Sequence, residues 1–280
     1  MVDPYTVSNL VRPFVIDPQL GATAGAISVG NARNLLTRWQ RLEYTCQVGV
    51  DRAAGEVLNS IMVVPGAAGA WRKSAVLAVG GYSTDTLAED ADLCLTLQHA
   101  GYRVAQVDEA LCYTEAPENF KDLMKQRKRW LLGQFQCLWK HRGMMLNPKH
   151  GWLGMFYLPI TLFGIAVPIL TQPFLWLTMT LATYNHGFSP LLPPFMIFAA
   201  VQAIIAVVAI ALMKRGPATL IGMGFDLVAY PPIRAYLLYR TTYSVLSGRL
   251  MGWNKLARTG NVTAPESALV HEVEMVYANN

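Results

Sequence analysis

Charge is scarce in this sequence and is absent from one long part of it. Asp, Glu, Lys and Arg make up 15% of the 280 residues, and none of them lies between Lys149 and Lys214. A charge-free stretch of this length accommodates two membrane spans of about 20 residues each, which we expect at about 156–183 and 191–213. A transporter or channel is disfavoured, because His186 is the one ionisable side chain within these expected spans.

Cysteine is also scarce, and the four cysteines show no paired spacing: Cys46, Cys94, Cys112 and Cys137. A disulfide framework is therefore not expected, and reduced thiols are the default. Cys137 and His141 are spaced to share one helix face, but no second pair of ligands accompanies them, so no metal site is predicted. The amino terminus lacks a basic segment followed by an apolar one, so no signal peptide is expected.

The charged residues that are present give a formal net charge of +5. The excess of positive charge lies just before the charge-free stretch, where anionic lipid headgroups and diphosphates are the partners it suits. Nucleic-acid binding has little support, because the basic residues stand among membrane-seeking apolar ones.

Residues 1–117 alternate short strands with helices. We expect a helix from Asp3-Pro4 to Leu10-Val11, further helices at Leu35–Leu58 and Glu89–Ala100, and strands at Gly21–Val29, Ile61–Val64, Val104–Val107 and Leu111–Tyr113. This alternation predicts an α/β layer architecture with a mostly parallel sheet.

The remaining chain divides into three parts. Residues 118–150 contain an amphipathic helix to about Arg142, whose apolar and Lys-rich faces are typical of a helix lying in the membrane interface. Residues 151–250 hold the two spans and a third segment, about 217–246, interrupted by charges and by Pro231-Pro232. Whether this segment spans stays open, and we expect the carboxy-terminal end to be cytosolic. Residues 251–280 carry a basic motif and a polar tail, predicted to be disordered.

Two polar clusters precede the charge-free stretch. Leu87–Asp92 reads Leu-Ala-Glu-Asp-Ala-Asp and puts carboxylates at the start of a helix. In the second cluster, Gln126, Arg129 and Trp130 are spaced i, i+3 and i+4 and so lie on one helix face. A carboxylate can accept a proton, and a guanidinium can pair with two phosphate oxygens. Together they suit a membrane enzyme acting on a phosphorylated sugar donor.

Simpler interpretations exist for both clusters. The acids are also what a solvated helix start contains, because carboxylates there favour the helix dipole. The basic and aromatic residues also suit an interfacial helix that touches lipid headgroups, a contact we expect for Arg127 and Lys128 in any case.

The two clusters resemble the signatures of the processive family 2 glycosyltransferases, which include cellulose synthases, hyaluronan synthases and bacterial poly-β-1,6-N-acetylglucosamine synthases. The family's Thr-Glu-Asp motif corresponds to Ala88-Glu89-Asp90, and its Gln-x-x-Arg-Trp motif to Gln126–Trp130. Val63–Arg72 and Trp253–Gly260 also resemble the family, so the similarity covers roughly residues 1–260, with four motifs in the family's order.

This resemblance implies a role for each motif. Asp90 is expected to be the catalytic base with Glu89 as a supporting acid, although Ala88 replaces the family's Thr and cannot hydrogen-bond. Arg129 is expected to bind the donor diphosphate, while Gln126 and Trp130 hold the acceptor sugar. Two further groups are expected near the substrates: Gly69 and Trp71 in an acceptor-side loop, and Trp253, Lys255, Arg258 and Thr259 closing over the diphosphate. The first of these groups could equally be only a tight turn, and the second could equally be an anchor that contacts lipid headgroups.

The resemblance also implies a fold and a setting. The chain corresponds to the second half of a GT-A-type domain followed by interfacial and transmembrane helices, in a multi-pass protein of the bacterial inner membrane with its catalytic part in the cytoplasm. In the family, a donor-binding half with an Asp-x-Asp metal site comes first, and Asp3-Pro4 resembles the residues just after it. We therefore expect the Mg²⁺ or Mn²⁺ ligands to lie outside this sequence, and residues 1–280 alone to form no polymer.

The implied reaction transfers a sugar with inversion from a UDP-sugar, expected to be UDP-N-acetylglucosamine, to a growing polysaccharide. The expected partners besides these substrates are the lipid bilayer and either the amino-terminal half or an accessory membrane subunit. The alternative is an inactive truncated or split-synthase partner that binds polysaccharide or another subunit. A transferase acting on lipid-linked sugars is a further alternative, and the sugar, linkage and oligomeric state stay open.

Overall fold

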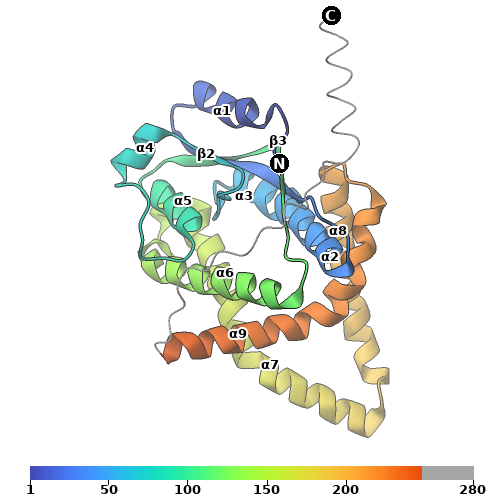
Figure 1. Ribbon diagram of the computed structural model, residues 1–280. Coiled ribbons are helices and arrows are strands. Elements are labelled where there is room, and N and C mark those ends of the chain that lie inside the picture. Colours follow the sequence, from blue (N-terminus) through green and yellow to red (C-terminus); the bar gives the residue numbers. More distant parts are fainter. Residues whose placement is uncertain (248–280) are drawn as a thin grey trace, which may run out of the picture.

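In the computed structural model, which describes residues 1–247, a three-stranded sheet of order β2–β1–β3 lies at the centre of the α/β part (Figure 1). β1 (Leu20–Val29) pairs in parallel with β3 (Arg103–Thr114) and antiparallel with the short β2 (Gly69–Trp71). The sheet is thus mixed, where the sequence predicted a mostly parallel one. The two strands expected within 104–113 form one strand, with a register shift opposite Gly25 and Ala26.

The predicted strand Ile61–Val64 is wrong, because these residues have no regular secondary structure and pair with no strand of the sheet. Ile61 and Val64 are buried in an apolar cluster that also contains Leu93 of the following helix. The carbonyl of Ile61 accepts hydrogen bonds from the side chains of Cys94 and Gln98. Side chains of the following helix therefore supply the hydrogen bonds to the Ile61 carbonyl that a neighbouring strand would otherwise supply.

Helices surround the sheet. Those before the second polar cluster are α1 (Thr6–Ile16), α2 (Leu35–Cys46), α3 (Ala53–Val57), α4 (Lys73–Ala78) and α5 (Glu89–His99). α1 begins two residues later than predicted, because the Asp3 side chain accepts the Tyr5 N–H at 3.1 Å in a turn that precedes the helix. The long helix predicted at Leu35–Leu58 is present as α2 and α3 joined by a π-helical turn, η1 (Gln47–Arg52).

α6 (Phe120–Lys140) carries the second polar cluster and lies beside α5 and α9 (Figure 1). Its start is capped by Asn119, whose side chain accepts the Asp122 N–H at 2.9 Å. The apolar positions Leu123, Leu132 and Leu138 are buried within the protein. The amphipathic pattern of this helix therefore reports internal packing, and its place in a membrane interface stays a prediction.

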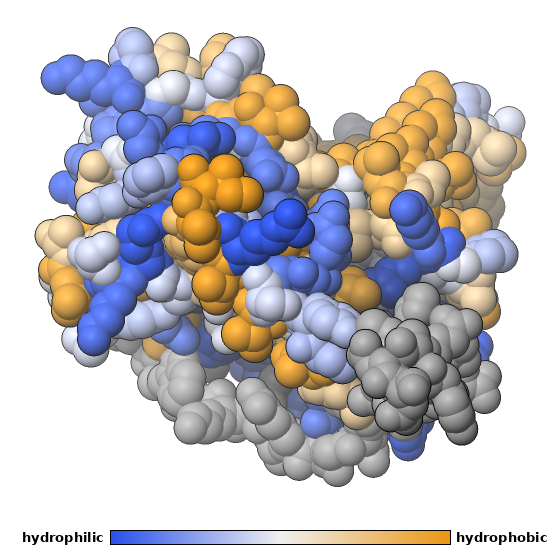
Figure 2. Space-filling view, turned by 90° about the horizontal axis from the view of Figure 1, so that it is seen from above, coloured by the Kyte–Doolittle hydropathy of each residue, from blue (hydrophilic) through white to orange (hydrophobic). Residues whose placement is uncertain are grey.

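A helical hairpin follows three short turns, η2 (Arg142–Met144), η3 (Pro148–His150) and η4 (Leu153–Tyr157). Its arms are α7 (Leu158–His186) and α8 (Leu192–Leu212), joined through η5 (Ser189–Leu191). By length and composition, Leu153–His186 and Ser189–Leu212 are each able to cross a membrane, close to the predicted spans. Most of their apolar side chains are exposed, and Figure 2 shows an apolar ridge on the side where α8 lies in Figure 1.

The third apolar segment does not form another candidate span within residues 1–247. It consists of η6 (Pro217–Gly222), the π-helical turn η7 (Phe225–Ala229) and α9 (Tyr230–Leu246), which contacts α6 and α7 (Figure 1). Pro173 cannot donate to the carbonyl of Ile169, and the Tyr239 hydroxyl of α9 donates to that carbonyl at 2.7 Å. α9 thus stabilises α7 at Pro173.

Candidate active site

α6 holds the first polar cluster in place through the backbone of Leu87. The Leu87 N–H donates to Gln136 Oε1 at 2.8 Å, and Arg129 Nη1 donates to the Leu87 carbonyl at 3.3 Å. Gly133 allows this close approach, because a Cβ at that position would lie 2.7 Å from the Cβ of Ala88. The helix with Gln126, Arg129 and Trp130 therefore fixes the segment that leads into Glu89 and Asp90.

Asp90 lies in the first turn of α5, with both carboxylate oxygens hydrogen-bonded. Oδ2 accepts the Gly66 N–H at 3.2 Å, and Oδ1 accepts the Ala91 N–H at 2.9 Å. Burial raises the pKa of Asp90 above its ordinary value, and the two N–H donors counteract this only in part. A carboxyl group with a raised pKa is a better proton acceptor once ionised, which is the property a general base needs.

Asp92 has a different environment, although it is only two residues away. It is buried between Lys140 and His141, each of which contacts one of its oxygens at 2.8 Å. Burial favours the neutral acid, but the bonds from His141 and Lys140 outweigh it and lower the pKa of Asp92. This group joins α5 to the end of α6, and it gives His141 a carboxylate partner.

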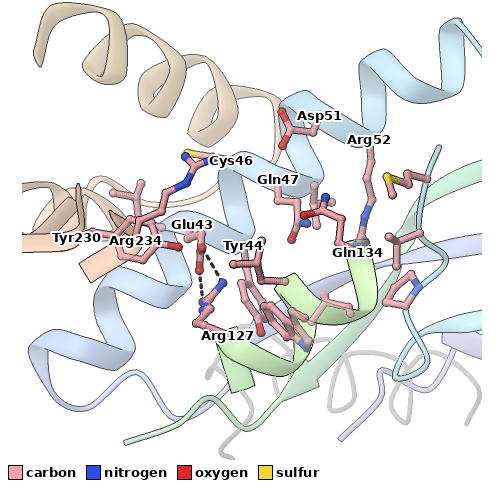
Figure 3. A pocket seen from close by; sticks show the side chains of 18 of the residues that line it. Glu43, Tyr44, Cys46, Gln47, Asp51, Arg52, Arg127, Gln134, Tyr230 and Arg234 are labelled. Atoms are coloured by element: carbon pink, nitrogen blue, oxygen red, sulfur yellow. Dashed lines mark hydrogen bonds and ion pairs between the residues drawn. The ribbon is translucent and has the colours of Figure 1, made fainter. Parts of the chain in front are cut away.

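Asp90 lines a cavity of about 660 Å³. Figure 3 shows this cavity from close by, with other polar residues of its wall labelled. Residues of α2, η1, α5 and α6 line the cavity together with residues of α7, α8, η7 and α9. Polar residues in the wall include Glu43, Arg52, Asp90, Arg127, Trp130 and Arg234, and apolar residues include Ile165, Ile205 and Leu237. The cavity therefore connects the predicted base with the helices that are long enough to cross a membrane.

Arg127 forms part of this wall and does not face lipid, so the expected headgroup contact of this residue is wrong. Its side chain is 9% exposed, and its guanidinium pairs with both carboxylate oxygens of Glu43, with Nη1 at 2.8 Å from Oε1 (Figure 3). The guanidinium carbon also lies 4.6 Å from the ring centre of Trp130 and 5.4 Å from that of Trp39. Arg127 thus supports Trp130 from inside the protein.

The predicted acceptor and donor residues are only partly brought together. Trp130 lines the cavity with Asp90. Gln126 lies one turn before Trp130 on α6, and its side-chain oxygen is buried with no hydrogen-bond partner among the described residues. Arg129 points toward Leu87 and is close enough to Asp90 to favour its ionised form. Neither Gln126 nor Arg129 lines the cavity.

The predicted acceptor-side loop is represented in the site by Gly66, which donates to Asp90. Gly69 is in β2, where a Cβ would lie 2.5 Å from a methyl carbon of Val64, so packing alone requires glycine there. Trp71 contacts Tyr82 edge-on, with ring centres 6.2 Å apart. Roles of Gly69 and Trp71 in acceptor binding stay predictions. Trp253, Lys255, Arg258 and Thr259 lie outside the described residues.

Comparison with known proteins shows the family of this chain. The sequence model described as "Glycosyl transferase family group 2" matches residues 1–213, about three quarters of the chain. The chain belongs to this glycosyltransferase family.

Similar family members include two bacterial synthases. The chain is 30% identical over 138 residues to the poly-beta-1,6-N-acetyl-D-glucosamine synthase of Staphylococcus aureus (strain COL), covering 49% of the chain and 34% of that synthase. It is 26% identical over 188 residues to the synthase of the same name from Staphylococcus epidermidis, covering 66% of the chain and 46% of that protein. The chain thus spans between a third and a half of the length of these relatives.

A solved structure shows the fold. The chain is similar to the mannosyltransferase PcManGT from Pyrobaculum calidifontis, solved in complex with GDP-Man and Mn²⁺, with a TM-score of 0.51 and 18% sequence identity. The similarity covers 88% of the chain and 59% of that protein. The fold is therefore that of a GT-A glycosyltransferase.

The side chains of residues 1–247 do not form a set of ligands for a metal ion. Across residues 1–247 no three or more His, Cys, Asp or Glu side chains are grouped so that they could hold one. Asp90, one of the acids that line the cavity, has its oxygens engaged by backbone N–H groups.

Sequence reasoning missed Glu43 and Arg52 as parts of the cavity wall. A signal for Glu43 was present, because it stands four residues after Trp39 within the apolar stripe of α2. A carboxylate in such a stripe indicates a buried counter-charge, here Arg127. Arg52 gave no such signal, because a π-helical turn is what brings it to the cavity.

Proposed function

We propose that this glycosyltransferase chain takes part in transferring a sugar with inversion from UDP-N-acetylglucosamine to a growing polysaccharide. The observation that carries the proposal is that Asp90 and Trp130 line one cavity, together with residues of both candidate membrane helices. A base and an aromatic sugar platform beside membrane-crossing helices suit an enzyme that elongates a polymer at a membrane. The similarity to two poly-β-1,6-N-acetylglucosamine synthases supports this sugar.

Asp90 acts as the general base in this proposal. Its carboxylate takes the proton of the acceptor hydroxyl while the hydroxyl oxygen attacks C1 of the donor sugar. The bond from C1 to the diphosphate oxygen breaks on the opposite face, UDP leaves with the electron pair, and the configuration at C1 inverts. Burial supports this role because it raises the pKa of Asp90. Glu89, the preceding acid, supports the negative potential that attracts the proton.

Arg129 stabilises the diphosphate as it leaves, because a guanidinium can donate to two phosphate oxygens at once. Its bond to the Leu87 carbonyl supports this assignment, since it keeps the guanidinium near the Asp90 segment. Trp130 stacks on the acceptor sugar, and the free oxygen of Gln126 accepts a hydrogen bond from an acceptor hydroxyl. Gly69 and Trp71 belong to the acceptor side, and Trp253, Lys255, Arg258 and Thr259 close over the diphosphate.

The metal chemistry of the reaction is not assigned to this chain. The Mn²⁺ named with the archaeal mannosyltransferase belongs to that protein, and the described residues here do not form a fitting ligand set. Ligands for Mg²⁺ or Mn²⁺ are expected on a donor-binding half, the proposed protein partner, and no step above passes through the metal.

The membrane setting is proposed from the two apolar helices. Residues 1–117 form the catalytic part in the cytoplasm, 118–150 the interface helix, and 151–250 the part that crosses the bacterial inner membrane. The free apolar faces of α7 and α8 support this division, because exposed surface of this kind is expensive in water.

The proposal is tested with a fusion in which residues 3–280 follow the donor-binding part of the Staphylococcus aureus synthase. Membranes containing the fusion should form polymer from UDP-N-acetylglucosamine, whereas membranes containing the donor-binding part alone should not. Binding of a β-1,6-linked N-acetylglucosamine pentasaccharide to the purified chain without polymer formation by the fusion would contradict catalysis. That outcome would favour the alternative, a partner subunit that binds polysaccharide.

A further inference from the structure

Arg52 is a buried cation in the cavity wall whose role the family motifs do not assign. It ends the π-helical turn η1 and is 8% exposed, and the close-up in Figure 3 shows it beside the cavity. One of its nitrogens, Nη1, donates to the carbonyl of Gly25 in β1 at 3.2 Å. A guanidinium has five N–H donors, so most of the hydrogen-bonding capacity of Arg52 is left for something else.

Arg52 differs in this respect from Arg127, the other buried arginine of residues 1–247, and from the half-buried Arg72. Arg127 pairs with Glu43, and Arg72 donates to the carbonyls of three residues: Phe14, Asp17 and Leu20. Within residues 1–247, Arg52 forms no ion pair. Burial lowers the pKa of Arg52, as expected for a cation removed from water. A buried charge of this kind is costly unless a partner supplies hydrogen-bond acceptors.

The backbone places Arg52 there by an unusual turn. α2 and α3 would form one regular helix if η1 were α-helical, but the wider π turn rotates the side chains that follow it. As a result Gln47, Asp51 and Arg52 all line the cavity (Figure 3). Single π turns inside α-helices frequently occur at functional sites.

The chemistry of the cavity selects the ligand class. A guanidinium requires oxygen acceptors. The wall also holds four carboxylates (Glu43, Asp51, Asp90 and Asp226) against three guanidiniums (Arg52, Arg127 and Arg234), so it offers an anion such as a diphosphate no net positive charge. A neutral ligand rich in hydroxyl groups satisfies both kinds of group, because hydroxyls accept from the guanidinium and donate to carboxylates.

We propose that Arg52 binds the acceptor sugar, its guanidinium donating hydrogen bonds to sugar oxygens in the cavity beside Asp90. This inference rests on the proposed function and deepens it, since it adds a contact from η1 to the α6 platform of Trp130. The bond to Gly25 orients the guanidinium, and the remaining donors face the substrate.

The test measures binding of a β-1,6-linked N-acetylglucosamine pentasaccharide to the purified full chain by calorimetry. Arg52→Gln keeps a donor for the Gly25 carbonyl but loses the positive charge and the paired N–H donors of the guanidinium. The affinity of this variant for the pentasaccharide should be lower by about tenfold or more. The matched control is Arg103→Gln, which removes an exposed arginine paired only with Asp17 and should bind like the native chain.

Three outcomes overturn the inference. The first is equal affinity of Arg52→Gln and the native chain. The second is weakened binding of UDP, with unchanged pentasaccharide binding, which would make the ligand a diphosphate. If Arg52→Gln does not fold, Arg52→Lys is measured instead, because it keeps the positive charge without the paired N–H donors. Severalfold weaker pentasaccharide binding by Arg52→Lys is expected, and unchanged binding is the third contradicting outcome. Failure of the native chain itself to bind pentasaccharide would instead contradict the proposed function.

Discussion

Arg127 of α6 and Glu43 of α2 form a two-point ion pair inside the cavity wall. The same guanidinium lies between the rings of Trp130 and Trp39, and Trp39 donates its indole N–H to Asp226 at 2.9 Å. Contacts therefore run without a break from η7 to the predicted acceptor platform. The position of Trp130 depends on how the α/β part and the third apolar segment pack together.

The first prediction concerns this ion pair. Arg127→Met leaves the partly buried carboxylate of Glu43 without its partner and should lower the free energy of unfolding by roughly 1–3 kcal/mol. A double variant, Glu43→Leu with Arg127→Met, should be more stable than Arg127→Met alone. Thermal unfolding in detergent at matched protein concentration ranks the three proteins. A double variant less stable than both single variants would show that the pair does not act as a unit.

The pH dependence of the Arg127→Met variant follows from Glu43. Burial raises the pKa of Glu43, with Arg127 opposing it, so removal of Arg127 should raise this pKa further. A carboxyl with a raised pKa in the folded state is more costly to the fold when ionised, so stability is lost as the pH rises through that value. The loss caused by Arg127→Met should be larger at pH 8 than at pH 5, and an equal loss would contradict this assignment.

The second prediction concerns Asp92, whose pKa is lowered in the folded state. Its contribution is present above the ordinary Asp pKa of about 3.9 and is lost as the pH falls through the lower folded value. Asp92→Asn should therefore cost on the order of 3 kcal/mol near pH 7, with a smaller difference from the native protein at pH 3. Unfolding curves between pH 3 and 7 measure both.

A matched control for Asp92 is Asp17→Asn. Asp17 pairs with Arg103, whose side chain is 55% exposed, and such surface pairs contribute only about 0–1 kcal/mol. If Asp17→Asn and Asp92→Asn destabilised the protein equally, the group of Asp92, Lys140 and His141 would not join α5 to α6 as described.

The third prediction concerns the close approach of α6 to the Asp90 segment. Gly133→Ala adds a Cβ that would lie 2.7 Å from Ala88 Cβ and 3.0 Å from Ala88 N, so the two segments must separate. Polymer formation by the fusion should fall at least about tenfold. Gly143→Ala is the control, because its Cβ would meet nothing within 4 Å. Normal activity of Gly133→Ala would show that this approach does not matter for catalysis.

The fourth prediction compares the neighbours Arg129 and Lys128, which lie about 100° apart around the axis of α6. Arg129→Ala should remove several kcal/mol of transition-state stabilisation, and the rate of polymer formation should fall accordingly. Lys128→Ala should lose much less, since an interfacial lysine contributes roughly 1 kcal/mol to lipid attraction. Both variants should stay in the membrane fraction. Equal losses, or release of either variant from the membrane, would identify the helix as an anchor.

The sequence predicted the elements that depend on local pattern. The amphipathic period of apolar residues predicted α6, and small and β-branched residues between glycines predicted β1. Acids in the first turn predicted α5, and the absence of charge predicted the two apolar helices. Ile61–Val64 was misassigned because an apolar run of four residues is consistent with burial of any kind. Which partner buries it depends on α5, more than twenty residues later in the chain.

The residues of the candidate site were predictable where they belong to a sequence motif. They were not predictable where their role depends on which residues bury them in the folded protein. Asp90 and Trp130 share a cavity, as the motifs imply. Arg127 was misassigned because a basic residue between Gln126 and Lys128 looks exposed, while its carboxylate partner is 84 positions away in the sequence. Pairings of this kind are invisible to local pattern, because they arise only when α2 and α6 meet.

The central claim is that Asp90 is the base of a glycosyltransferase, and one substitution tests it most directly. Asp90→Asn keeps the size of the side chain and an oxygen for the Gly66 or Ala91 N–H. In the fusion, turnover with UDP-N-acetylglucosamine should fall by about 10²–10⁴. Binding of UDP and of the pentasaccharide should persist, and Glu89→Gln should cost far less. Polymer formation by Asp90→Asn at the native rate would contradict the account.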